Sequence, residues 1–410
     1  MGAFVLVARW MLPSPERLVE GGGLLVEGAR VRAVLASRAA VRRALAGGAR
    51  ARELGEVLLT PGTVNAHAHL ELGGLHGRLP RDEAFAAWIG ELLAERAALG
   101  RADFERAVVR GADRLLATGT TAVGDVDSTG AAGLRLGAHP IRARVYREVL
   151  DARDPARSAA ALRRVRRGLP PRRGRLEGLS PHAPYSVSPE LFRRAAELAR
   201  RRGLPCAVHW AETEEERRWL LAGDGPFARI LRDPPRQSGL DAIEVAGLLG
   251  PGLALVHGNH PERGDYERIA RAGSTLVHCP GTHTFFGREP FDVGRALRAG
   301  VSLALGTDSL ASNEELDMRR ETSLLRRSAP GLRPATVWGI ATRGGARALG
   351  LEGQIGVLAP GALADVCAWV AAPASAEAAC DRLTSGEPRL AAAWVGGRRA
   401  RRPQRTRRSD

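Results

Sequence analysis

Short apolar runs alternate with amphipathic segments through most of the chain. The segments between the runs include Ser188–Arg202, Arg263–Ala272 and Asp292–Ala299, where apolar residues recur with the helical period. The apolar runs are rich in Val, Leu and Ala and are predicted to be strands at Thr60–His67, Thr120–Val126, Ala143–Val149, Arg175–Leu179, Pro205–His209, Leu253–His257, Ser274–His278 and Ser302–Leu305. Because they are almost continuously apolar, they are typical of a parallel sheet that helices cover on both faces.

Eight strand–helix units predict an α/β fold, a closed (β/α)8 TIM-type barrel over residues 60–350, with a doubly wound open sheet as the alternative. The two ends of the chain differ, because residues 1–59 and 351–400 contain short strand-like runs with glycine turns. Neither end is long enough to bury a core of its own. We therefore expect both termini to form one small composite β-sandwich domain, with the barrel inserted between its two parts. Residues 401–410 are an Arg-rich tail.

Composition and charge exclude several classes of protein. The chain has 410 residues, of which 44% are hydrophobic and 26% charged, and its 49 Gly and 25 Pro follow no repeat, which excludes fibrous and disordered proteins. The net charge of +16 comes from arginine alone, since the sequence contains no lysine. A Schiff-base lysine, a P-loop lysine and a carbamylated-lysine metal bridge are therefore excluded. The arginine runs lack interleaved aromatic residues, so we expect no nucleic-acid partner.

Cysteine spacing and hydropathy bear on the compartment. Cys206, Cys279, Cys367 and Cys380 are far apart and form no CxxC motif, which is typical of reduced thiols in a cytosol. No apolar stretch reaches the roughly 18 residues that a membrane span requires. We expect a cytoplasmic protein without a membrane partner, and the sequence leaves homo-oligomerisation open.

Histidine and aspartate residues stand at the ends of four predicted strands. His67 and His69 close the first strand, His209 and His257 end the fifth and sixth, and Asp308 follows the eighth. Residues two apart on a strand project to the same face, and the carboxyl ends of barrel strands meet where barrel active sites are built. Three of these histidines and the aspartate therefore predict a nitrogen- and oxygen-rich metal site, made of His67, His69, His209 and Asp308.

The predicted cofactor is one divalent metal ion, with Zn²⁺ as the first choice and Fe²⁺ as the alternative. Such an ion lowers the pKa of a bound water to about 7, so we expect hydrolytic chemistry. Glu212 stands three residues after His209 and is predicted to transfer protons in that reaction. Glu214–Glu216 follow Thr213 and are instead predicted to be the acidic first turn of a helix. The four predicted ligands leave no place for His257 in the metal's coordination shell. His257 is therefore expected to act beside the water, as a proton shuttle or an orienting group.

Several segments of the sequence together resemble those of a known family. The segments Asn65-Ala-His-Ala-His-Leu-Glu, His209-Trp-Ala-Glu, His257, Cys279-Pro-Gly-Thr-His and Gly306-Thr-Asp-Ser-Leu-Ala-Ser-Asn are similar to those of the amidohydrolase superfamily, in its cytosine-deaminase-like and triazine-hydrolase-like branch. The resemblance implies the same roles, with Glu212 as general acid/base, His257 assisting the water, and a metal held by His67, His69, His209 and Asp308. We count Asp308 among the catalytic residues as well.

The resemblance also implies which residues contact the substrate. His182, at the end of the fourth strand, matches a position that contacts substrate in nucleoside-type deaminases, Ser312 matches a pocket-lining serine, and Glu71 is a further pocket candidate. Within the branch, the His-Leu-Glu-Leu segment and Phe285-Phe286-Gly are most similar to the aminodeoxyfutalosine deaminase-like group. Cys279-Pro-Gly-Thr-His departs from the Cys-Pro-x-Ser-Asn of many relatives, so the resemblance leaves the identity of the substrate open.

The leading hypothesis is a metal-dependent hydrolytic deaminase of an amino-substituted heteroaromatic ring. Its small-molecule substrate would be a purine-like base or nucleoside, aminodeoxyfutalosine included. Two alternatives keep the site and change the leaving group, namely a hydrolytic dechlorinase and a cyclic-amide hydrolase. A third alternative is a catalytically inactive barrel that serves as an interaction scaffold, and the complete ligand set argues against it.

Overall fold

Across residues 2–81, 84–167 and 175–400, which the computed structural model describes, eight parallel strands surround the barrel axis in chain order. They are β6 (Thr63–Ala68), β7 (Thr120–Asp127), β8 (Arg142–Val149), β9 (Arg175–Pro181), β10 (Cys206–Trp210), β11 (Leu253–His257), β12 (Thr275–His278) and β13 (Ser302–Leu305). A bridge between Ala68 and Asp308 joins the last strand to the first, and the amides of Thr307 and Asp308 both donate to the His67 carbonyl at 3.1 Å. The predicted barrel is therefore confirmed.

Helices surround the barrel, and the three predicted ones are observed as α6 (Pro189–Arg202), α9 (Asp265–Ala272) and α11 (Val293–Arg298). At the start of α6 the Ser188 hydroxyl accepts a hydrogen bond from the Leu191 amide at 3.1 Å, and Gly203 ends the helix with a φ of +61°. Further helical segments of the barrel are α2 (Phe85–Ala97), α3 (Arg101–Ala117), α4 (Ala131–Arg135), α5 (Pro155–Arg167), α7 (Glu214–Ala222), α8 (Gly239–Val245), α10 (Pro280–Phe285), α12 (Met318–Ser328), α13 (Pro334–Gly339) and α14 (Gly345–Ala348), with the short turns η1 (Leu70–Leu75), η2 (Pro226–Arg229) and η3 (Ile340–Gly344).

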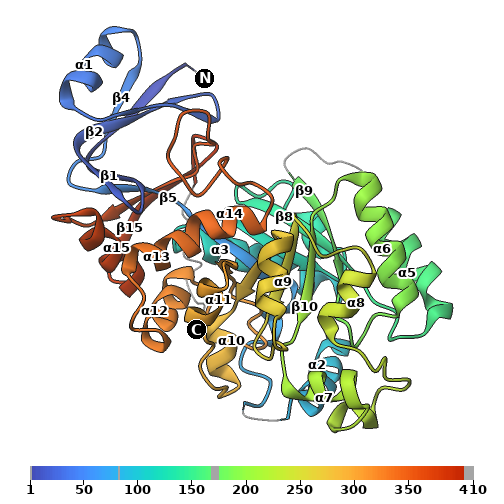
Figure 1. Ribbon diagram of the computed structural model, residues 1–410. Helices are drawn as coiled ribbons and strands as arrows, with labels where there is room; N and C mark the ends of the chain where they lie inside the picture. The colour runs from blue at the N-terminus through green and yellow to red at the C-terminus, as the bar shows by residue number, and fades with distance from the viewer. Residues whose placement is uncertain (1, 82–83, 168–174, 401–410) are drawn as a thin grey trace, which may run out of the picture.

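Strands from the two ends of the chain lie side by side next to the barrel, as predicted (Figure 1). The strand β5 (Leu58–Pro61) joins the two halves, because it pairs with both β1 (Phe4–Ser14) and β14 (Val366–Val370). The order of this connected sheet is β16-β15-β14-β5-β1-β2-β3, with β4 against β1. The other strands are β2 (Arg17–Glu27), β3 (Arg30–Leu35), β4 (Arg50–Glu53), β15 (Arg389–Val395) and β16 (Arg398–Arg399).

Two helices interrupt the terminal strands, where the sequence pattern predicted strands alone. They are α1 (Arg38–Ala46) and α15 (Ala376–Ser385). Each begins after a serine, Ser37 or Ser375, whose hydroxyl accepts a hydrogen bond from a backbone amide three residues later. This local cap stabilises the first turn of each helix.

Apolar side chains fill the inside of the barrel and leave no room for a ligand there. A functional site is therefore expected at the carboxyl ends of the strands. Val64, Ala122, Val126 and Tyr146 are among the residues of this inner core, and all are buried. The four cysteines are buried and unpaired. Within the described residues, no helix has both the length and the apolar character needed to cross a membrane. The Arg-rich tail at residues 401–410 lies outside the described residues.

Candidate active site

Four histidines and one aspartate converge at the carboxyl end of the barrel. The ring centroid of His67 lies 4.9 Å from those of both His69 and His209 and 6.0 Å from that of His257. Asp308 Oδ1 lies 3.5 Å from His67 Nε2 and 3.8 Å from His69 Nε2. Possible ligand atoms within 4.8 Å of one another form two overlapping groups, one with His67, His209 and His257 and one with His67, His69 and Asp308. The structure thus brings all four predicted ligands together and places His257 next to them.

The ring nitrogens of this group face one another at short distances. His209 Nδ1 donates to the His182 carbonyl at 3.0 Å, so the Nε2 of the neutral ring carries a lone pair. That atom lies 3.2 Å from His69 Nε2. Burial lowers the pKa of His69 to about 3 and that of His209 well below its usual range, so both rings are neutral. His67 Nε2 is buried and makes no hydrogen bond within the described residues. These donor atoms fit a divalent cation.

Asp308 is held by its backbone and by two hydroxyl groups. Its φ is +54°, a left-handed value that is uncommon outside glycine and that persists where the surrounding structure enforces it. Its Oδ2 accepts hydrogen bonds from Thr282 Oγ1 at 3.1 Å and Ser312 Oγ at 3.0 Å. Burial acts to raise the pKa of Asp308, but the contact with His67 and the nearby His69 hold it well below its usual range. Ser312, predicted to line the pocket, therefore also orients the carboxylate.

Asn65 connects the first barrel strand to the loop after the last one. Its Nδ2 donates to Thr307 Oγ1 at 2.7 Å, and its Oδ1 accepts from the amides of Thr307 at 3.1 Å and of His67 at 3.3 Å. These groups are buried. No role was predicted for Asn65, because its partner Thr307 is 242 residues away in the chain.

Substituting Asn65 by alanine is expected to lower the free energy of unfolding by about 1–3 kcal/mol, because the buried His67 amide loses its acceptor and the Thr307 hydroxyl loses its donor. The Thr307 amide keeps the His67 carbonyl as its acceptor. Equilibrium unfolding in urea measures the change. Gln237→Ala is the control, since the Gln237 side chain makes no hydrogen bond within the described residues. Equal stabilities of the two variants would contradict this role of Asn65.

Glu212 lies beside the converging histidines and is 5% exposed. Its Oε2 lies 3.5 Å from His257 Nε2, and its Oε1 accepts a hydrogen bond from Arg288 Nη2 at 3.3 Å. Burial raises the pKa of Glu212 to about 7, although Arg288 acts to lower it. A carboxyl group that titrates near neutrality can both accept and donate a proton. Its position and acidity therefore suit the predicted proton transfer.

The backbone around Glu212 is held by the helix that follows. Thr213 Oγ1 accepts a hydrogen bond from the Glu216 amide at 3.1 Å, so α7 begins as the sequence predicts. Glu216 has a further role that was not predicted. Its Oε2 accepts from the Glu212 amide at 2.8 Å and its Oε1 from the amide of Ala211 at 3.3 Å, where the backbone φ is +49°. Glu216 thus positions Glu212 through the main chain.

A cavity of about 430 Å³ opens beside these groups. Its polar end includes His69, His209, Glu212, His257 and Asp308. Aromatic side chains from α2, η2 and neighbouring loops line the rest, namely Phe85, Trp88, Tyr185, Phe227 and Phe286. The rings of Tyr185 and Phe227 stack with their centroids 4.9 Å apart. A cavity of this size with aromatic walls suits a flat ring with substituents.

The residues predicted to contact substrate differ in how many hydrogen bonds they already make within the protein. His182 lines the cavity with its Nδ1 2.6 Å from the Ser186 hydroxyl. Glu71 also lines the cavity, but its carboxyl oxygens accept hydrogen bonds from the hydroxyls and amides of Ser128 and Thr129. Burial raises the pKa of Glu71 to about 7. The substrate-binding roles of His182 and Glu71 stay predictions.

Arg288 is a site residue that the sequence analysis missed. Besides donating to Glu212, its guanidinium lies 4.5 Å from the ring centroid of Phe286. It stands in the connection after α10 and belongs to none of the quoted motifs. In a chain whose basic residues are all arginine, no local signal distinguishes it from surface arginines.

The sequence is similar to those of known proteins. A sequence model described as the amidohydrolase family matches residues 58–405. The aminodeoxyfutalosine deaminase of Deinococcus radiodurans is 32% identical over 321 residues, which cover 73% of this chain and 75% of that protein. A 5-methylthioadenosine/S-adenosylhomocysteine deaminase of Nitratidesulfovibrio vulgaris is 31% identical over 371 residues, covering 86% of this chain and 79% of the relative.

Solved structures show the same fold. An adenosine deaminase from Xanthomonas campestris with bound zinc superposes with a TM-score of 0.80 at 25% identity, covering 97% of this chain and 92% of that one. The aminofutalosine deaminase of Helicobacter pylori in complex with methylthio-coformycin gives a TM-score of 0.84 over 97% of this chain and 100% of that one, and at 20% identity it bears on the fold alone. From the family match, the relatives and the converging histidines, we conclude that the chain belongs to the amidohydrolase family of metal-dependent hydrolases.

Proposed function

We propose that this protein is a hydrolytic deaminase, which replaces the amino group of a purine-like ring in a nucleoside by oxygen and releases ammonia. The observation that carries the proposal is the buried carboxyl group of Glu212, 3.5 Å from His257, at the polar end of an aromatic-walled cavity. The relatives support the class of ring, because their names specify aminodeoxyfutalosine and 5-methylthioadenosine or S-adenosylhomocysteine as substrates.

His67, His69, His209 and Asp308 are the residues that would hold one divalent cation, and zinc is the proposed ion. Support comes from the neutral ring nitrogens that face one another and from His67 Nε2, which is buried without a hydrogen-bond partner within the described residues. The similar structure from Xanthomonas campestris contains zinc. When bound, the cation supplies Lewis acidity that lowers the pKa of a water molecule to about 7.

Proton transfer falls to Glu212, with His257 beside it. Glu212 would take a proton from the attacking water and give it to the ring nitrogen next to the amino-bearing carbon. A carbon–oxygen bond forms in this step. The second proton of the same water then passes to the amino group, the carbon–nitrogen bond breaks, and ammonia leaves an oxo-substituted ring. Arg288 holds the carboxyl in place through Oε1, which leaves Oε2 toward His257.

A screen for ammonia release tests this function. The panel consists of aminodeoxyfutalosine, 5-methylthioadenosine, 5′-deoxyadenosine, adenine and an aminopyrimidine, with protein loaded with zinc or with iron. We expect ammonia and the oxo-ring product in equal amounts from at least one purine nucleoside. Chloride release from a chlorotriazine, or opening of a cyclic amide, without any deamination would replace the proposal by one of the alternatives. Native protein without stoichiometric metal and without turnover would favour the scaffold.

A further inference from the structure

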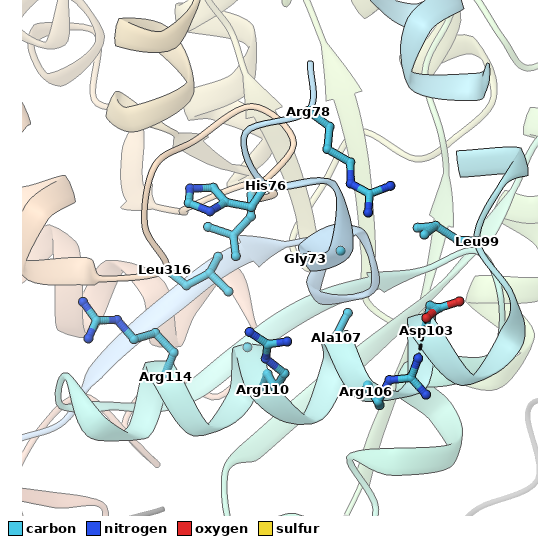
Figure 2. A pocket seen from close by; sticks show the side chains of 13 residues that line it. Gly73, His76, Arg78, Leu99, Asp103, Arg106, Ala107, Arg110, Arg114 and Leu316 are labelled. Atoms are coloured by element: carbon cyan, nitrogen blue, oxygen red, sulfur yellow. Dashed lines mark hydrogen bonds and ion pairs between the residues drawn. The ribbon is translucent and has the colours of Figure 1, made fainter. Parts of the chain in front are cut away.

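A second hollow of about 490 Å³ lies outside the catalytic cavity, between α3 and the segment that starts with η1 (Figure 2). Small and apolar residues form its floor, including Gly73, Ala107, Gly111, Leu310 and Leu316. Glycine at position 111 allows the helix and η1 to pack closely, since a Cβ there would come within 2.9 Å of the Leu70 side chain. The floor of the hollow therefore consists of small side chains and rests on a close contact between α3 and η1.

Basic side chains surround this floor on two sides. Arg106, Arg110 and Arg114 repeat every four residues along one face of α3, and His76 and Arg78 come from the segment after η1 (Figure 2). Asp103 is the only carboxylate among the described residues that line the hollow. The lining of the hollow thus holds four arginines and one histidine against one carboxylate, and this excess of basic groups favours an anionic ligand.

The arginines differ in how far carboxylates of the protein already satisfy them. Arg106 pairs with Asp103, Arg114 pairs with Glu315 at 2.8 Å, and Arg78 lies 3.4 Å from Glu95. Arg110, in the middle of the row, makes no ion pair or hydrogen bond within the described residues, and neither does His76. Like charges four residues apart destabilise a helix. A bound anion at Arg110 would remove this repulsion.

We propose that this hollow binds a phosphomonoester of a small organic molecule. The guanidinium fork matches the geometry of phosphate oxygens, and a phosphomonoester carries about −1.5 to −2 charges at pH 7. The volume lies in the range of small-molecule pockets and exceeds what a phosphate group alone requires. Leu99, Leu310 and Leu316 offer an apolar surface to the carbon part of such a ligand.

The hollow shares η1 with the catalytic cavity. Glu71 and Leu72 line the cavity, whereas Gly73 and Gly74, in the same turn, line the hollow. The turn begins directly after His69. A phosphomonoester in the hollow would therefore contact Gly73 and Gly74 of η1, while Glu71 and Leu72 of the same turn face the catalytic cavity. We infer that such a ligand acts as an effector of the active site. This second part rests on the proposed function.

Isothermal titration calorimetry on the full-length protein tests the binding, with ribose 5-phosphate, ribose and inorganic phosphate as probes. We expect ribose 5-phosphate to bind one site per chain with an affinity that falls as salt is added, and ribose not to bind. Arg110→Gln should weaken binding by at least about tenfold, because a charge-assisted hydrogen bond is lost. Arg200→Gln is the matched control, since Arg200 is exposed on α6 and unpaired within the described residues.

Absence of saturable binding, equal affinities of the Arg110 and Arg200 variants, or equal binding of ribose and ribose 5-phosphate would each overturn the site. The effector part is tested separately through kcat/KM for deamination at saturating ribose 5-phosphate. A change of about fivefold or more is expected in the wild type and should be absent in Arg110→Gln. An unchanged kcat/KM in the wild type would overturn the effector role. The calorimetry decides the binding whether or not the chain proves to be a deaminase.

Discussion

Replacing Glu212 by glutamine is expected to slow turnover by about 10²- to 10⁴-fold while the protein keeps its metal. The carboxamide has the shape of the carboxyl group, and its oxygen can still accept the hydrogen bond that Arg288 donates at 3.3 Å. It cannot take a proton from water. Since Glu212 is not one of the proposed ligands, metal content measured by inductively coupled plasma mass spectrometry should match that of the wild type. Initial rates of ammonia release measure the catalytic effect.

Glu214→Gln is the matched control for this variant. Glu214 lies two residues away, its side chain is 50% exposed, and it pairs with Arg217 at 2.8 Å on the surface of α7. Exposed pairs of this kind contribute little to stability, so we expect the rate to stay within a factor of about two. If the Glu212 variant releases ammonia as fast as this control, Glu212 has no part in proton transfer.

Asp308→Asn is expected to remove metal and activity together. The substitution keeps the size of the side chain but removes the negative charge next to His67 and His69, at 3.5 and 3.8 Å. It also places a carboxamide against Thr282 and Ser312, which now donate to Oδ2. Loss of a group that merely supports a ligand costs about 10- to 100-fold in metal affinity, and loss of a ligand should cost at least as much. We expect turnover to fall by about 10²-fold or more.

Metal content after gel filtration and the rate of ammonia release are measured on the same preparation of this variant. Asp265→Asn is the control, because Asp265 is also buried but lies on α9, where its carboxylate accepts from the Glu262 amide at 2.9 Å. This control can lose stability but should keep its metal. An Asp308 variant that retains a full equivalent of metal would show that the aspartate is not a ligand.

The strands of the barrel and the helices α6, α9 and α11 could be predicted because their signals are local. The run Leu253–His257 is apolar at each position before its terminal histidine, and it is observed as β11 with the same limits. The caps of α6 at Ser188 and Gly203 are equally local. The helices α1 and α15 were not predicted, because the strand-like runs and glycine turns on either side of them determined the prediction for both ends of the chain. Pairing of the two termini was predicted from length, whereas the β5–β14 register was not.

The residue types at the strand ends determined the candidate chemistry, because a parallel barrel places every strand end on one face. His67, His69, His209 and Asp308 could therefore be grouped from the sequence alone. Only the tertiary structure decided which distant segments support them. Asn65 meets Thr307 across the barrel closure, Arg288 reaches Glu212, and the arginines of α3 line a hollow behind η1. The Asn65–Thr307 and Arg288–Glu212 contacts join residues far apart in the chain, so loop paths and packing determine them. The arginines of α3 do repeat every four residues, but that spacing does not show which segment packs opposite them.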